Sequence, residues 1–289
     1  MLTIEKIINL LNKFWDTQGC VILQALDTEV GAGTFHPATF LKALGTNSWK
    51  TAYVQPTRRP QDSRFGKHPN KMQNFHQYQV ILKPPLPNIL DLYLKSLHLL
   101  GLKTSNEDIK FIEDNWKSPT LAAWGIGWEV RINGLEVSQI TYFQNIGGIR
   151  CSPISVELTY GIERLALILQ QKNTIKKLLW KECIDNIVYS YETLFKNYEY
   201  EMSVYNKDNH DINCLILQMN NLTAECKYLI EKKLVYPALD ITTKLSHLYN
   251  LIETKKKVPL DVRKKIILQI RFFAIKIAEL YLKKQNKHI

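Results

Sequence analysis

The chain begins with apolar side chains three or four positions apart, the spacing of one face of an α-helix: Ile4, Ile7, Ile8, Leu11 and Phe14. A short apolar run at 20–23 then predicts a buried strand. A loop rich in small residues leads from it to a short helical stretch at 38–44. The pattern changes from helix to strand within the first 25 residues, which is typical of a mixed α and β domain.

Two strand-like runs, at 51–55 and 74–83, enclose a polar and basic stretch without periodicity at 56–73. This arrangement predicts an antiparallel hairpin with a long loop. Long loops inside compact domains are usually functional. The hairpin is therefore the first place where we expect a site.

The next elements are a helix, four strands and a second helix, predicted in this order at 88–100, 110–113, 128–132, 135–143, 154–158 and 160–170. Gly101 ends the first of these helices. Asn133-Gly134 separates two of the strands and is the strongest short signal for a hairpin.

From residue 171 onward every pattern is helical, for example at 261–280. We therefore predict an α+β fold, with an antiparallel sheet flanked by helices over 1–170 and an all-helical domain over 171–289. No apolar run approaches the roughly 18 residues that span a bilayer. We expect a cytoplasmic protein without a membrane segment.

Charge is distributed unevenly between the two predicted domains. The net charge is +11, with 17 basic against 14 acidic residues up to 170 and 21 against 13 beyond it. A basic half favours a polyanion or an acidic partner, and a solvated lysine-rich surface explains it equally well. Where lysine dominates, arginines are candidates for planar recognition of phosphate or carboxylate, and six precede residue 170: Arg58, Arg59, Arg64, Arg131, Arg150 and Arg164.

The predicted hairpin carries the first set of candidate residues. Side chains alternate along a strand, so Phe75, Gln77 and Gln79 share one face. A planar heterocycle would stack on Phe75 while Arg58 or Arg59 reaches a phosphate. An ordinary amphipathic hairpin with a solvated loop explains the same pattern, and the residues alone leave both interpretations open.

A carboxylate and an amide, Glu136 and Gln139, lie three residues apart on a later strand. Mg²⁺ takes one or two carboxylates and completes its shell with water and substrate phosphate. The pair is compatible with such an ion. A lone glutamate on the outer face of a strand is, however, far commoner.

Arg164 lies in the first turn of the helix that follows Gly161. The positive end of the helix dipole disfavours an arginine there unless an anion is bound. This mismatch predicts a phosphate site. An ion pair of Arg164 with Glu157 or Glu163 is the alternative.

Six stretches of the chain carry a resemblance to a known family: GAGTFHPATFLKALG (31–45), AYVQPTRRP (52–60), NKMQNFHQYQVILKP (70–84), FIEDNWKSPTLAAWGIGWEV (111–130), LEVSQITYFQNIGG (135–148) and ELTYGIERLAL (157–167). The arginine-bearing hairpin and the strand–GIER–helix element resemble motifs 2 and 3 of class II aminoacyl-tRNA synthetases. In this order, the six stretches resemble the α subunit of bacterial heterotetrameric glycyl-tRNA synthetase. The resemblance covers essentially the whole chain.

This resemblance implies a class II synthetase-type catalytic domain over 1–170. It would form glycyl-adenylate from glycine and ATP with Mg²⁺, and glycine would then pass to the 3′ end of tRNA(Gly). The family works as an α2β2 assembly, so the implied partners are a second copy, bound through the catalytic domain, and a β subunit. The basic domain over 171–289 would contact the β subunit or tRNA.

The resemblance also implies residue roles. ATP would be bound by Arg58, Arg59, Asn70, Gln73, Phe75, Gln77 and Arg164, of which Arg59 and Arg164 would be catalytic. Arg59 or its neighbour Arg58 would hold the α-phosphate and Arg164 the γ-phosphate, with Mg²⁺ on Glu136 and Gln139. An ammonium group requires acceptors, so the glycine candidates are Glu157 and Gln79, with Thr34 and Trp116 at the wall and carboxylate side.

Two other functions remain open at this point. A ligase for another small carboxylic acid would share Arg164 and Glu136 but differ around Thr34, Trp116 and Glu157. A catalytically silent paralogue, acting as a regulatory or RNA-binding subunit, would be expected to lose its motif arginines, which are all present here. A purely helical RNA-binding module explains the basic half but not the first 170 residues.

Overall fold

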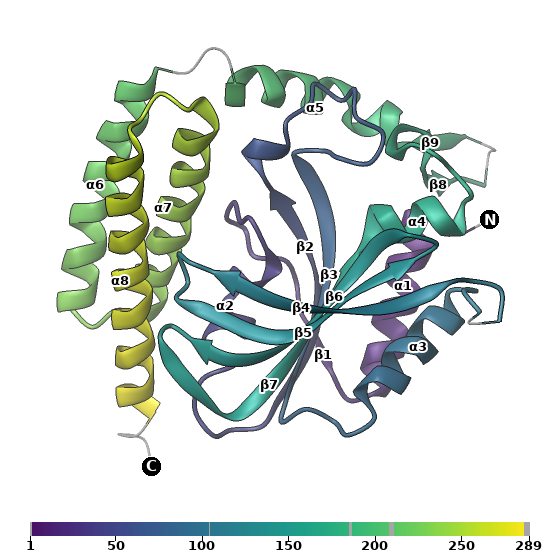
Figure 1. Ribbon diagram of the computed structural model, residues 1–289, viewed down its shortest axis with the longest axis horizontal. Helices are drawn as coiled ribbons and strands as arrows, with labels where there is room; N and C mark the ends of the chain where they lie inside the picture. Colours follow the sequence, from purple (N-terminus) through teal and green to yellow (C-terminus); the bar gives the residue numbers. More distant parts are fainter. Residues whose placement is uncertain (1, 104, 185–186, 208–210, 286–289) are drawn as a thin grey trace.

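A seven-stranded sheet forms the centre of the computed structural model, which describes residues 2–103, 105–184, 187–207 and 211–285 (Figure 1). The strand order is β1-β2-β3-β7-β6-β5-β4, with β1 parallel to β2 and the other neighbours antiparallel. The predicted α+β class is confirmed. The strands are β1 (Val21–Ile22), β2 (Trp49–Arg58), β3 (Asn74–Lys83), β4 (Ile109–Ser118), β5 (Ala123–Ile132), β6 (Leu135–Ile146) and β7 (Ile149–Gly161).

Three helices cover one face of the sheet, and their apolar stripes supply most of the core. Trp15, Tyr93 and Leu165 are fully buried there against residues of the central strands such as Val80 and Leu158. Because this face is filled with apolar side chains, the polar residues of the same strands are directed to the opposite face. The three helices are α1 (Ile4–Thr17), α3 (Ile89–Leu99) and α4 (Ile162–Leu169).

The other face is only partly covered. A loop carrying the 3₁₀ turn η1 (Gly33–Phe35) and the short helix α2 (Pro37–Phe40) crosses it. Tyr53 fixes this loop, because its hydroxyl bonds the Gly33 carbonyl at 2.9 Å and the Thr39 hydroxyl at 2.6 Å. The loop closes one side of the hollow in which the candidate site lies.

The C-terminal region is mostly helical, as predicted, but its first part is not. Residues 179–182 and 188–190 form a two-stranded antiparallel sheet, so the expectation of helix throughout is wrong for these residues. Each strand has only three or four residues, which is too few for the period of the hydrophobic pattern to distinguish strand from helix. The elements are β8 (Leu179–Glu182), β9 (Val188–Ser190), α5 (Tyr191–Lys207), α6 (Ile212–Glu231), α7 (Val235–Lys255) and α8 (Leu260–Gln285).

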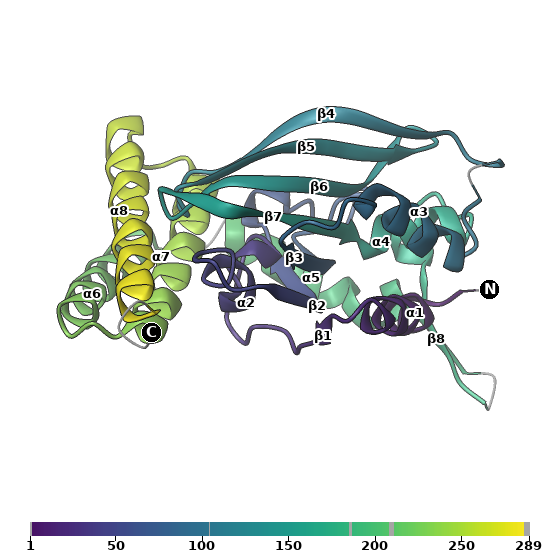
Figure 2. The ribbon, with the colours of Figure 1, turned by 90° about the horizontal axis from the view of Figure 1, so that it is seen from below.

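Helices α6, α7 and α8 stand together at one end of the sheet (Figure 2). They share an apolar cluster of their own, which includes Leu245 and Phe273. Ala274 and Ile277 of α8 also pack with Phe143 of β6 in a second cluster. Among the residues that the structure describes, no helix combines the length and the apolar character that crossing a membrane requires.

Local turn chemistry agrees with the sequence in most places. Asn133 and Gly134 have φ angles of 52° and 81°, as the hairpin between β5 and β6 requires, and Gly101 has φ 94° after α3. The strand expected at 20–23 is present, but it is not buried. Val21 is 51% exposed because β1 is an edge strand with a single neighbour.

Candidate active site

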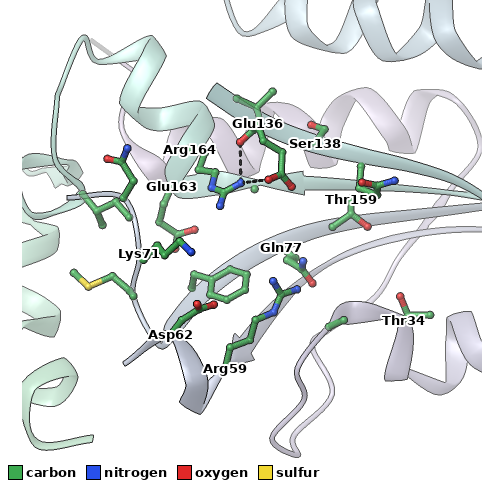
Figure 3. Close-up of a pocket in the computed structure, with 18 of the residues that line it drawn as sticks. Thr34, Arg59, Asp62, Lys71, Gln77, Glu136, Ser138, Thr159, Glu163 and Arg164 are labelled. Atoms are coloured by element: carbon green, nitrogen blue, oxygen red, sulfur yellow. Dashed lines mark hydrogen bonds and ion pairs between the residues drawn. The ribbon is translucent and has the colours of Figure 1, made fainter. Parts of the chain in front are cut away.

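A cavity of about 350 Å³ opens on the partly covered face of the sheet. It is lined by the η1 loop, the β2–β3 loop and residues of β3, β4, β6, β7 and α4 (Figure 3). The fold thus brings together most of the candidates from distant parts of the chain: Thr34, Arg59, Asn70, Phe75, Gln77, Trp116, Glu136, Gln139, Glu157 and Arg164.

The cavity distinguishes the two neighbouring arginines at the end of β2. Arg59 faces into it, with its guanidinium carbon 4.9 Å from the centroid of the Phe75 ring and its Nε donating to the Gly31 carbonyl at 2.9 Å. Burial lowers the pKa of the Arg59 guanidinium, and the nearby Asp62 carboxylate opposes that shift. The cavity therefore holds a largely desolvated cation.

Arg58 points elsewhere, as alternation along the strand requires. Its Nη1 forms an ion pair with Glu29 at 3.1 Å, and its guanidinium lies 6.0 Å from the Tyr198 ring centroid. Arg58 is not part of the cavity lining. Of the two arginines between which the sequence left the choice open, the cavity is thus lined by Arg59.

Arg164 enters the cavity from the side opposite Arg59 (Figure 3). It lies in the first turn of α4, as predicted. Its Nη1 contacts Oε2 of Glu136 at 2.8 Å and donates to the Glu136 carbonyl at 3.1 Å. The alternative considered from the sequence, an ion pair with Glu157 or Glu163, is wrong, because the first turn of α4 lies beside β6 and Arg164 pairs with Glu136 there.

Glu136 and Gln139 both face the cavity, although residues three apart on a regular strand face opposite sides. A β-bulge explains this. Arg131 pairs with Glu136 and the next residue of β5, Val130, pairs with Ser138, so β6 contains one extra residue at Val137.

The two side chains place a carboxylate and an amide on one face of β6. The Gln139 amide nitrogen is buried and has no hydrogen-bond partner among the described residues. The Glu136 side chain is 44% exposed towards the opening. One carboxylate and one amide oxygen suit Mg²⁺, which takes its remaining ligands from phosphate and water. The residues present therefore fit this ion.

Glu157 of β7 lies at the floor of the cavity. It accepts hydrogen bonds from the Thr34 hydroxyl at 2.8 and 3.0 Å and from the Gln79 amide at 2.8 Å. Burial raises the pKa of the Glu157 carboxyl to about 7, while the hydrogen bonds from Thr34, Gln79 and Thr159 oppose the shift. The Glu157 carboxyl is thus a hydrogen-bond acceptor that becomes negatively charged near neutral pH.

Two other candidates occupy different positions from those expected. Gln79 is buried behind Glu157 and does not line the cavity, so it orients the carboxylate instead of contacting a ligand directly. Gln73 is fully buried and also lies outside the lining, so the expected ATP contact is not supported. Its backbone instead bonds Arg59, with 2.7 Å between the Arg59 nitrogen and the Gln73 carbonyl.

A comparison with protein families identifies the kind of protein to which this cavity belongs. The family model described as glycyl-tRNA synthetase alpha subunit matches residues 4–286 of this chain. The chain belongs to the glycyl-tRNA synthetase alpha subunit family. The resemblance stated from the sequence is confirmed, and the family is one of tRNA ligases.

Two solved structures are similar to this family member. The crystal structure of pyrrolysyl-tRNA synthetase from Desulfitobacterium hafniense is 13% identical, with a TM-score of 0.44 over 64% of this chain and 76% of that chain. A structure of the pyrrolysyl-tRNA synthetase PylSc from the same organism is 14% identical, with a TM-score of 0.42 over 60% of this chain and 71% of that chain.

The alpha subunit cavity also contains residues that sequence reasoning missed: Asp62, Lys71, Ser138, Thr159 and Glu163. Glu163 accepts from the His76 ring at 2.7 Å and from the Tyr191 hydroxyl at 3.3 Å, so it joins α4, β3 and α5. Its place beside Arg164 in the GIER stretch was an available signal. Asp62 and Lys71 lie in the aperiodic loop, where the hydrophobic pattern carries no information.

Proposed function

We propose that this chain activates glycine with ATP inside the cavity, forming glycyl-adenylate and pyrophosphate. With a β subunit, it would then transfer glycine to the 3′ end of tRNA(Gly). The observation that carries the proposal is the meeting of Arg59, Arg164 and Glu157 in one cavity. Two cations suit a triphosphate, and a buried carboxylate suits an ammonium group.

The first step is an in-line displacement. A glycine carboxylate oxygen attacks the α-phosphorus, the bond from the α-phosphorus to the bridging oxygen breaks, and pyrophosphate leaves. No protein nucleophile takes part, so the rate depends on positioning and on stabilising the developing charge. Arg59 is held for this role by the Gly31 carbonyl and by the Phe75 ring.

The nucleotide would lie between the two arginines. Arg59 would contact the α-phosphate, and Arg164 the γ-phosphate of an ATP bent back on itself. Adenine would stack on Phe75, with Asn70 and Gln77 as polar neighbours in the lining. Mg²⁺ held by Glu136 and Gln139 would neutralise charge on the phosphates.

Glycine would lie on the cavity floor. Its ammonium would donate to Glu157, which Gln79 and Thr34 hold in place. Trp116 would form the wall, since its ring packs edge-on against Phe143 with 5.6 Å between ring centroids. A wall fitted to the glycine hydrogens excludes a Cβ by steric clash. In an open pocket, by contrast, one methylene changes the binding free energy by only about 1–3 kcal/mol.

The remaining assignments rest on the family. We propose that residues 1–170 are the catalytic domain, through which two copies would form a dimer, and that the protein acts in the cytoplasm. Residues 171–289 would contact the β subunit or tRNA, and their 21 basic against 13 acidic residues favour a polyanion nearby.

Glycine-dependent ATP–pyrophosphate exchange tests the proposal, measured with and without the β subunit and alongside Arg164→Ala. We expect exchange with glycine that alanine does not support and that Arg164→Ala largely removes. Exchange driven equally by an unrelated small acid would favour a different ligase. A complete lack of exchange in the complex would favour a silent paralogue.

A further inference from the structure

Helix α5 buries an unusual set of side chains. Its buried residues are Tyr191, Glu199, Ser203 and Asn206, and all four carry polar groups. They recur at helical spacing, so they form one stripe along the helix. Helices of globular proteins normally bury an apolar stripe. This face of α5 is therefore suited to hydrogen bonding with whatever it covers.

The stripe covers the loop between β2 and β3, beside which α5 lies in Figure 1. This loop carries Arg59, Asp62 and Lys71 to the cavity. Every buried residue of α5 forms a hydrogen bond with a residue of this loop or with Asn74, the first residue of β3. The bonds are Tyr191 Oη to the Asn74 carbonyl (3.2 Å), Gln73 N to Glu199 Oε1 (2.7 Å), Phe65 N to Ser203 Oγ (3.0 Å) and Asn206 Nδ2 to Ser63 Oγ (2.9 Å).

Glu199 has the most direct connection to the cavity. The β2–β3 ladder ends at the pair Arg58 and Asn74. One residue beyond it, the Gln73 carbonyl accepts from the Arg59 nitrogen at 2.7 Å, and the Gln73 nitrogen donates to Glu199 at 2.7 Å. Two hydrogen bonds, both formed by the backbone of Gln73, thus link the Glu199 carboxylate to Arg59, the residue proposed for the phosphate site.

Glu199 is only 2% exposed, so it costs free energy to keep its carboxylate charged. Burial and the Asp62 carboxylate raise the pKa of the Glu199 carboxyl, to about 7, while the backbone N–H groups of Gln73 and Asn74 oppose the shift. Without Glu199, these N–H groups would be left without their acceptor, at a cost of about 1–3 kcal/mol each. The hydrogen bonds and the cost of losing them both indicate that the Glu199 carboxylate fixes the loop at Gln73.

We propose that Glu199 is a positioning residue for glycine activation, which acts through Gln73 to hold Arg59 in place at the α-phosphate. The inference rests on the proposed function and adds a residue that touches neither substrate. It also assigns α5, which follows the catalytic domain in sequence, a part in the ATP site.

The test is ATP–pyrophosphate exchange by Glu199→Ala and Glu199→Gln in the full chain with its β subunit. Misplacement of a group by about 1 Å can cost up to 10²-fold in rate, so we expect Glu199→Ala to lower kcat/KM for ATP by about 10- to 100-fold. The KM for glycine should stay within about twofold, because Glu157 lies on a different strand. Glu199→Gln keeps an acceptor oxygen and should restore most of the activity.

Glu201→Ala is the matched control, because Glu201 lies on the same helix and is exposed. It should behave as the wild type. If Glu199→Ala does not fold, Glu199→Asp, whose carboxylate is withdrawn by one methylene, should show a smaller loss confined to ATP. A folded Glu199→Ala or Glu199→Asp with unchanged ATP kinetics would overturn the inference, as would equal losses for ATP and glycine. Failure of the proposed function is distinguished from these results, because the wild type itself would then show no glycine-dependent exchange.

Discussion

Arg164 of α4 and Glu136 of β6 form an ion pair at the cavity, with 2.8 Å between Nη1 and Oε2. A second hydrogen bond joins the same guanidinium nitrogen to the Glu136 carbonyl at 3.1 Å. Both bonds use one nitrogen, so the rest of the fork-shaped guanidinium remains directed at the cavity. The pair orients Arg164, the residue proposed for the γ-phosphate, and it places this cation beside the carboxylate proposed for Mg²⁺.

Replacing Arg164 with alanine should lower kcat for exchange by about 10²–10³-fold, as for other preorganised groups that stabilise transition-state charge. Arg131→Ala is a suitable control, because Arg131 pairs with Glu129 outside the cavity lining and its side chain is 45% exposed. Exchange kinetics of the two variants give the comparison. Equal losses in both variants would show that Arg164 has no special role.

Arg59 and Arg58 offer a sharper comparison, since they are neighbours with different orientations. Arg59→Ala should lower kcat/KM for ATP by about 10²–10³-fold. Arg58→Ala removes a partly exposed pair with Glu29, an interaction worth about 0–1 kcal/mol, and should change the kinetics by less than about fivefold. The measurement is steady-state exchange at varied ATP concentration. A larger loss in Arg58→Ala would mean that the phosphate lies on the other side of β2.

Glycine binding should depend on pH through Glu157. The pKa of this carboxyl is about 7 in the folded chain, above its ordinary value of 4.5, so it is mostly protonated at pH 6 and mostly ionised at pH 8. An ammonium group binds the ionised form, so the KM for glycine should fall by up to roughly tenfold as the pH rises from 6 to 8. The KM for ATP, measured in parallel, reports any change that does not involve the glycine site.

Glu157→Gln provides the control for that pH profile. It keeps the shape of the side chain and removes the titration, so glycine should bind weakly at both pH values. A profile for Glu157→Gln that matches the wild type would assign the titration to another group.

Gly33 should not tolerate a side chain. A Cβ at this position would come within 2.6 and 2.7 Å of Cδ and Nε2 of Gln79, the amide that holds Glu157. Gly33→Ala must therefore displace Gln79, and we expect the KM for glycine to rise by roughly 10- to 150-fold, because a lost hydrogen bond to a charged group costs about 1.5–3 kcal/mol. Gly31→Ala is the matched control, because its Cβ meets only ordinary contacts from 3.5 Å. Equal glycine kinetics in the two variants would contradict this role of Gln79.

Lys83 should matter for stability instead of catalysis. Its buried Nζ donates to the carbonyls of Lys42, Leu44 and Gly45 at 2.7, 2.6 and 3.1 Å. Lys83→Met leaves these carbonyls without a donor and should lower the free energy of unfolding by about 2–4 kcal/mol. Urea unfolding of Lys83→Met, compared with the exposed Lys95→Met, measures the effect. Identical midpoints would show that the three carbonyls do not need this cation.

Much of the catalytic half could be predicted because its elements have clear periods. Alternation along β3 correctly placed Phe75, Gln77 and Gln79 on one face, and the Asn133-Gly134 turn was found from two residues. Alternation also predicts that Arg58 and Arg59 face opposite sides of the sheet. Which of the two faces the cavity could be decided only from the structure, because it depends on which face the helices cover.

The rest depended on interactions that no local pattern records. The bulge at Val137 results from the pairing of β6 with β5, and it brings Glu136 and Gln139 to the same face, where regular alternation would separate them. The buried stripe of α5 is polar, so a search for apolar periodicity passes over Glu199. These features arise from tertiary contacts between segments far apart in the chain, which override local propensity.

A crystal structure of the chain with glycyl-sulfamoyl-adenosine, an analogue of the adenylate, tests the central claim most directly. We predict adenine stacked on Phe75, the sulfamoyl group within hydrogen-bond distance of Arg59, and the glycyl ammonium bonded to Glu157. An analogue bound outside this cavity, or bound inside it with its ammonium directed away from Glu157, would contradict the account.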